Sequence, residues 1–205
     1  MVESRPPVRR TYIRTMSRRF TTIIFSLMSI AAGAQTCSSI KQFNFRNSQI
    51  PIAAQYAGGV RSGPELFRLQ DGAGFVSDDP DNLQSHDWSL DLLTDRLEHP
   101  DPATWVRVVV VDKNHLTGTG DWHYVMAFGC KDGFLTSLFQ VGHEGVMLQH
   151  VTDQTLELYE MIWDKGDAHC CPSRHMDLLY KWSPQRHRYD LARSMSVPNR
   201  LQGQH

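Results

Sequence analysis

The sequence predicts an α+β domain in which an antiparallel β-meander sheet carries one or two short N-terminal helices packed on it. Two observations lead to this prediction. From Trp105 onward, short apolar runs with a two-residue period alternate with turn residues, which is typical of antiparallel strands joined by hairpins. Before that point, from Gln35 to Pro102, the sequence is polar and broken by glycine and aspartate clusters, and two stretches show helical character.

The two predicted helices lie in this first, polar zone. One covers residues 63–69, and the other runs from Trp88 to Leu97 with Ser85 or Asp87 as its cap. In the second helix the large apolar residues gather on one side, as expected of a helix that packs on a sheet. These residues are Trp88, Leu92, Leu93 and Leu97.

The strands follow from Trp105 onward. The run of valines between Val106 and Val111 is apolar on both faces, which predicts a strand that is covered on both sides. Asp132-Gly133 suits the positive φ angles of a tight hairpin turn, and it separates two of the strands that follow. The further strands are predicted at residues 122–128, 134–141, 146–151, 155–163, 177–182 and 186–191.

The first 34 residues have the organisation of a secretory signal peptide. Arginines dominate residues 1–20, a short apolar stretch runs from Thr21 to Ile30, and an Ala-x-Ala site ends at Ala34. The translation start is either Met1 or Met16. The apolar stretch is much shorter than the roughly 20 residues that span a bilayer, so we expect a periplasmic or secreted protein with no membrane span after cleavage.

The predicted domain organisation follows from this cleavage. The 171 residues that remain fit one domain with a core of its own. The predicted parts are a signal peptide at 1–34, an N-terminal extension at 35–62, a single α+β domain at 63–195 and a C-terminal tail at 196–205.

Loss of the signal peptide makes the chain acidic. It removes six of 21 basic and one of 22 acidic residues, which leaves 15 against 21 and a net charge of −6. We therefore expect no nucleic-acid partner, because phosphate-backbone binding needs clustered Lys and Arg. The only dense basic cluster after cleavage, at residues 186–188, is interpreted as a solvated face. The expected partner is an unknown protein or small ligand of the cell envelope, and no cofactor is predicted.

Four cysteines in an exported chain predict disulfides, because the compartment is oxidising. Cys170 and Cys171 are neighbours, and their Cα atoms are about 3.8 Å apart, below the usual disulfide minimum of about 4.4 Å. In an extended segment their side chains also point to opposite faces. We therefore predict that one of them pairs with Cys130 and the other with Cys37. The sequence does not decide which, and it leaves lipidation or a free thiol at Cys37 open.

A metal site is the alternative for the same region. His169, Cys170, Cys171 and His175 lie within seven residues, and these are zinc-ligand types. Zinc sites usually leave two to four residues between paired cysteines, however, and an oxidising compartment consumes thiols. The disulfide interpretation is therefore preferred.

A candidate pocket is predicted from Asp121, His123, His143 and Glu144. His143-Glu144 begins like a zinc-protease motif, but the next histidine is His150, and there is no Gly-x-Ser-x-Gly nucleophile motif. No catalytic residue is therefore assigned. The favoured hypothesis is a binding or interaction module, and the alternative is an enzyme that uses a carboxylate and histidine cluster. The two differ in whether these four residues line one pocket with shifted pKa values.

The C-terminal part of the chain carries a family resemblance. Its features are Gly118-Thr119-Gly120-Asp121, a strand leading to a glycine turn, Asp167-x-x-Cys170-Cys171-Pro172-Ser173 and Tyr180-x-Trp182. In these features the chain resembles the LppP/LprE-type lipoproteins and their secreted relatives, exported bacterial proteins of unknown function. The resemblance implies an exported, disulfide-stapled β-rich domain and supplies no catalytic residue. The chain differs from the lipoprotein members in lacking their lipidation motif before Cys37.

Overall fold

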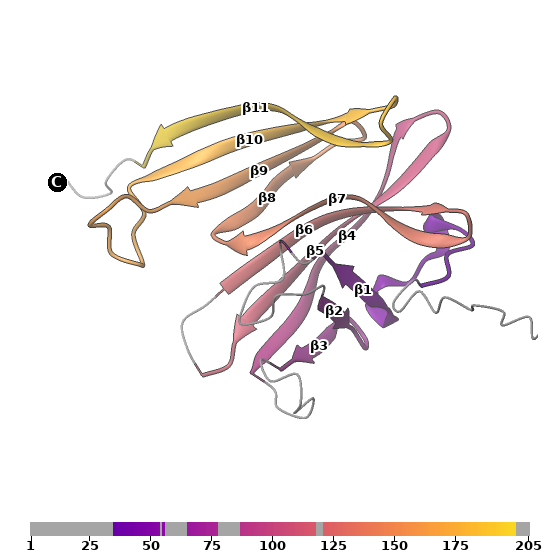
Figure 1. The fold of residues 1–205 in the computed structure, drawn as a ribbon, viewed down its shortest axis with the longest axis horizontal. Coiled ribbons are helices and arrows are strands. Elements are labelled where there is room, and N and C mark those ends of the chain that lie inside the picture. Colours follow the sequence, from indigo (N-terminus) through magenta and orange to yellow (C-terminus); the bar gives the residue numbers. More distant parts are fainter. Residues whose placement is uncertain (1–34, 54, 56–64, 78–86, 118–120, 200–205) are drawn as a thin grey trace, which may run out of the picture. The chain divides into compact units, whose positions relative to one another are not determined.

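In the computed structural model, the chain is almost entirely β (Figure 1). The structure describes residues 35–53, 55, 65–77, 87–117 and 121–199, and the predicted signal peptide lies outside these ranges. Of the described residues, 68% lie in strands and 5% in short helical turns. None of the helical turns in these ranges is long and apolar enough to cross a membrane.

Short elements come first and long strands follow. Two one-turn 3-10 helices, η1 (Ile40–Gln42) and η2 (Phe45–Asn47), precede the strands. The strands are β1 (Gln49–Ile52), β2 (Glu65–Arg68), β3 (Ala73–Val76), β4 (Trp88–Asp101), β5 (Thr104–His115), β6 (Asp121–Lys131), β7 (Phe134–Glu144), β8 (Val146–Val151), β9 (Thr155–Ile162), β10 (Arg174–Ser183) and β11 (Arg188–Pro198).

The strands form antiparallel sheets (Figure 1). β1 pairs with β2, a five-stranded sheet has the order β3-β4-β5-β6-β7, and a four-stranded sheet has the order β11-β10-β9-β8. Strands that are neighbours in the sequence are neighbours in each sheet, so the predicted antiparallel meander is confirmed. The chain passes from the five-stranded to the four-stranded sheet at Gly145. Its φ is 78°, and a Cβ there would lie 2.8 Å from Met161 Cβ, so only glycine fits without strain.

The five-stranded sheet is covered on both faces. On one face, Val109 and Val111 belong to a core that includes residues of η1, η2, β1 and β2. On the other face, Val106, Val108 and Val110 belong to a second core that includes the four-stranded sheet. All five valines are buried, which confirms the prediction of a doubly covered strand.

Both segments predicted as helices contain strands instead, β2 and β4, so the predicted α+β class is wrong. In β4, the alternate residues Trp88 and Leu90 are buried, and Leu92 is partly buried against the same core. Leu93 and Leu97, which completed the helical stripe, are 56% and 39% exposed. Pairing with the long strand β5 along most of its length outweighs the helical spacing.

The turn between β6 and β7 brings the N-terminal segment to the sheet. Asp132 and Gly133 have φ angles of 53° and 81°, as predicted for this hairpin. The Cys37 amide donates a hydrogen bond to the Gly133 carbonyl (2.8 Å). This contact places Cys37 beside Cys130 at the end of β6, and the two form a disulfide with their Cα atoms 5.5 Å apart.

The predicted cysteine pairing is therefore wrong. Cys130 pairs with Cys37, and Cys170 pairs with its neighbour Cys171. Cys170 lines a pocket together with Asp121, which begins β6, whereas Cys130 lies nine positions further along that strand. At about 3.3 Å per residue, this separation is roughly 30 Å, far beyond the reach of a disulfide.

Candidate functional site

Antiparallel pairing of β5 with β6 assembles a cluster of two carboxylates and one imidazole. Asp112 of β5 lies opposite His123 of β6, and Asp121 precedes His123 by two positions, which places it on the same face. Their ligand-type oxygen and nitrogen atoms all lie within 4.8 Å of one another. We call Asp112, Asp121 and His123 the acid–histidine cluster.

The imidazole lies between the two carboxylates. His123 Nε2 is 3.7 Å from Asp112 Oδ1, and its Nδ1 is 3.6 Å from Asp121 Oδ1. The side chains of Asp112 and His123 are each 16% exposed, whereas that of Asp121 is 59% exposed. Asp112 Oδ2 accepts a hydrogen bond from Asn114 Nδ2 (2.6 Å). Asp112 Oδ1 and His123 Nδ1 are buried, and within the described residues neither has a hydrogen-bond partner.

The surroundings raise the pKa of Asp121 from 3.8 to about 6. The leading cause is loss of hydration, and the neighbouring Asp112 carboxyl raises this pKa further. The cluster therefore favours a positive charge, either a proton or a cation, between its carboxylates.

The cluster opens into a pocket of about 310 Å³. Asp121, His123 and Glu144, three of the four residues predicted for a pocket, line it together. The fourth, His143, does not line it: its Nε2 lies 3.5 Å from a carboxylate oxygen of Glu160 on β9. The remaining lining residues are Gly145, Met147, Met161, Trp163, His169 and Cys170.

Two further polar residues of this region were not predicted to belong to it. Asp112 lies within β5. Counting the register of the β5–β6 hairpin would have placed it opposite His123. His169 approaches from the loop after β9, and its Nε2 lies 2.9 Å from Glu144 Oε1. No local sequence signal indicates that contact.

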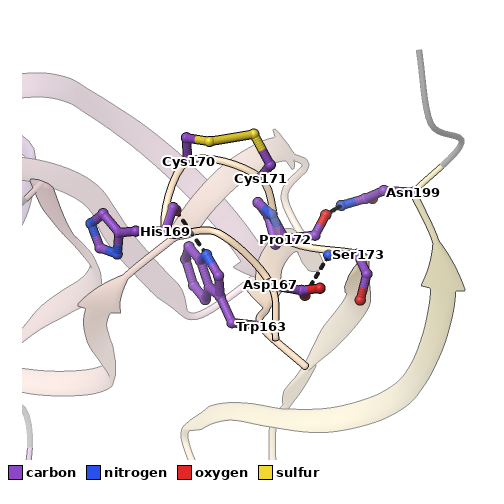
Figure 2. The surroundings of a disulfide bond; sticks show 8 residues. All are labelled: Trp163, Asp167, His169, Cys170, Cys171, Pro172, Ser173 and Asn199. Atoms are coloured by element: carbon purple, nitrogen blue, oxygen red, sulfur yellow. Dashed lines mark hydrogen bonds between the residues drawn. A yellow bond between two sulfur atoms is a disulfide. The ribbon is translucent and has the colours of Figure 1, made fainter. Parts of the chain in front are cut away.

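The Cys170–Cys171 disulfide lies in the loop between β9 and β10 (Figure 2). The Cys171 amide donates to the Ala168 carbonyl (2.9 Å), which closes a four-residue turn. In a turn, neighbouring side chains need not point to opposite faces as they do in a strand. This local geometry removes the objection that rested on an extended segment, although the Cα atoms of the two cysteines are 3.8 Å apart as expected. Trp163 Nε1 donates to the His169 carbonyl (2.9 Å) and ties the turn to the pocket wall.

Polar contacts hold the same loop at its other side (Figure 2). Asp167 Oδ2 accepts hydrogen bonds from the backbone amides of Ser173 (2.8 Å) and Asp164 (2.7 Å), and these bonds lower the pKa of the Asp167 carboxyl. The Arg174 guanidinium donates to the Asp164 carboxylate, which lowers the pKa of that carboxyl. Asn199 Nδ2 donates to the Pro172 carbonyl (2.7 Å).

The alternative metal set of His169, Cys170, Cys171 and His175 is not brought together. The two sulfurs are joined to each other, and His175 stacks on Tyr159 with 4.5 Å between ring centroids. His175 Nδ1 also contacts Asn199 Oδ1 at 2.5 Å. Within the described part of the chain, the group spaced for a metal ion is the acid–histidine cluster.

Comparisons of the chain with protein-family models, curated proteins and solved structures found no match.

Proposed function

We propose that this chain is an exported, disulfide-stabilised binding domain whose acid–histidine cluster binds a divalent transition-metal ion. The main observation in favour of a metal ion is the environment of the Asp112 carboxylate. Its Oδ1 is buried without a hydrogen-bond partner among the described residues, and it faces ligand atoms of His123 and Asp121. A buried carboxylate oxygen without a partner is costly, and a cation held by the three side chains removes that cost.

The donor set favours one class of metal. Carboxylates alone suit Ca²⁺, Mg²⁺ and Mn²⁺, whereas an added imidazole favours Zn²⁺ and related transition-metal ions. By the usual affinity order for such sites, Zn²⁺ should bind more tightly than Mn²⁺. Three protein ligands leave at least one coordination position for a ligand from the pocket.

The pocket limits what that ligand can be. Met147, Met161 and Trp163 give it apolar walls, and the contact between Glu144 and His169 lies at its side. At about 310 Å³ it has room for a small molecule. A small, metal-coordinating molecule of the cell envelope is therefore the proposed partner, in preference to a docked protein.

A calorimetric titration tests the metal site. Zn²⁺ should bind the metal-free protein at one site, and Asp112→Asn or His123→Ala should weaken binding by more than tenfold. Matched controls are Glu157→Gln and His150→Ala, which change exposed residues outside the cluster and should leave binding intact. Equal affinity in the wild type and the cluster variants, or no binding, would refute the proposal.

Export has separate support. The basic and apolar organisation of the first 34 residues, the Cys37–Cys130 disulfide and the resemblance to LppP/LprE-type proteins all favour it. The intact mass of the protein recovered outside the cytoplasm should correspond to a chain beginning at Gln35. Reduction should add about four daltons, because each of two disulfides takes up two hydrogen atoms. A mass that begins at Met1 or Met16 would refute cleavage.

An enzyme is the second candidate, and the raised pKa of Asp121, about 6, favours it. Carboxyls with such pKa values serve as general acids or bases near neutral pH. A panel of chromogenic ester, phosphate and glycoside substrates, with and without Zn²⁺, tests this candidate. Turnover that Asp121→Asn abolishes would favour an enzyme. Turnover that survives this substitution would exclude the cluster as its source.

A further inference from the structure

A second and larger pocket, of about 530 Å³, lies at the opposite end of β6. It is formed by parts of the chain that are far apart in the sequence: η1, the turn between β4 and β5, the β6–β7 hairpin and the turn between β10 and β11. Cys130 lines it, whereas the acid–histidine pocket includes Asp121. The nine intervening positions of β6 separate the two pockets by roughly 30 Å. They are therefore distinct sites.

The charge of this second pocket is opposite to that of the whole mature chain. Its charged lining residues are Lys41, Lys131 and Arg186, and no acidic residue of the described chain lines it. Within the described residues, Lys41 and Lys131 form no salt bridge, and Arg186 pairs only loosely with Asp190 at 3.4 Å. Two residues of the basic cluster that was interpreted from sequence as a solvated face, Arg186 and His187, line the pocket together with these two distant lysines. An anion in the pocket would meet three cationic side chains, of which only Arg186 has an acidic partner among the described residues.

The walls of the pocket are apolar and held in place before any ligand arrives. Lys41 Nζ lies 3.7 Å from the Trp105 ring centroid, and the His99 ring stacks on Trp105 with 4.1 Å between centroids. Trp182 Nε1 donates to Asp101 Oδ2 (2.7 Å), which fixes that indole. Ile40 and Leu138 complete the apolar lining. A rigid wall lowers the entropic cost of binding a flat ligand.

We propose that this pocket binds a small organic anion, with a flat apolar body against its apolar lining and a carboxylate or sulfonate near Lys131 and Arg186. Its volume lies in the range of small-molecule sites. Because Cys130 lines the pocket and Lys41 follows Cys37 by four positions, the Cys37–Cys130 disulfide also holds one wall of the site. The proposal is independent of the metal site.

The test compares two ligands of nearly the same shape, one anionic and one neutral. By calorimetry, 2-naphthoate should bind the full chain with one saturable site, and the neutral 2-naphthamide should bind at least about tenfold more weakly, because charge-assisted hydrogen bonds are lost. Lys131→Ala and Arg186→Ala should each weaken 2-naphthoate binding by about fivefold, since both side chains are exposed and their charges are screened. Lys181→Ala, an exposed lysine outside the pocket, should not change it.

Two further variants assign the site. Asp112→Asn should leave 2-naphthoate binding unchanged, because the cluster lies at the other end of β6. Trp105→Leu should weaken binding while the far-ultraviolet circular dichroism spectrum stays that of the wild type. Equal binding of acid and amide, no saturable binding, or full affinity in the Lys131→Ala/Arg186→Ala double variant would overturn the proposal.

Discussion

The two disulfides should contribute very unequally to stability, and their loop lengths predict by how much. Cys37 and Cys130 are 93 positions apart, so their bond closes a long loop. In the chain-entropy model, a loop of this length removes about 16 cal/mol/K from the unfolded state, which stabilises the fold by about 4.6 kcal/mol at 25 °C. Cys170 and Cys171 close only their own peptide unit, for which the same model gives about 1 kcal/mol.

The perturbation is a pair of double variants, Cys37→Ala/Cys130→Ala and Cys170→Ala/Cys171→Ala. With a urea m-value of about 2 kcal/mol/M, the first should lower the urea midpoint by about 2 M and the second by about 0.5 M. Cys37 is 2% exposed, so truncation there adds a small cavity cost to the entropy term. Circular dichroism of the oxidised proteins measures both midpoints. Equal shifts for the two variants would refute the loop-length argument.

Two other predictions concern single residues. Burial raises the pKa of the Glu98 carboxyl above its ordinary value of 4.5, and the neighbouring Asp153 adds to this, so the unfolding free energy should fall as pH rises through the folded pKa. Glu98→Gln should flatten that dependence in urea midpoints measured from about pH 4 to about pH 8, and a slope identical to that of the wild type would contradict it. Gly142→Ala should cost about 3 kcal/mol, because its Cβ would lie 2.2 Å from Tyr124 Cδ1. The control Gly133→Ala meets no atom within 4 Å and should cost only about 1 kcal/mol from its positive φ, so equal midpoints would contradict the clash.

The strands that were predictable are those with both a two-residue period and a turn signal. β8 was predicted with the bounds that it has, and Asp132-Gly133 located the β6–β7 hairpin. The same dipeptide, Asp71-Gly72, turns the chain between β2 and β3 with φ angles of 55° and 91°. The short strands beside it lie in a polar zone, but a turn of this type argues against a helix over residues 63–69.

The site was predictable only in part, because a hairpin, the register of a neighbouring strand and the path of a loop each bring some of its residues together. Asp121 and His123 lie at the start of β6 and Glu144 at the end of β7, and the β6–β7 hairpin, which was predicted from its turn, brings these strand ends together. Asp112 required the register of a neighbouring strand. The contact of His169 with Glu144 depends on the path of a loop that contains no regular element. Sequence periodicity carries no information about such a path.

The burial of the middle of β6 explains why its candidate ligand-binding residues lie at its two ends. From Tyr124 to Phe128 every side chain is at most 1% exposed, and these residues divide between the two cores by alternation. A polar or charged group in that span would be buried on either face without solvent, at a cost of several kcal/mol. Functional groups on this strand can therefore lie only where a covering layer ends. Asp121 and His123 lie at one such end, and Lys131 lies at the other. The same argument predicts that substitutions within Tyr124–Phe128 change stability, whereas ligand binding is altered by substitutions outside it.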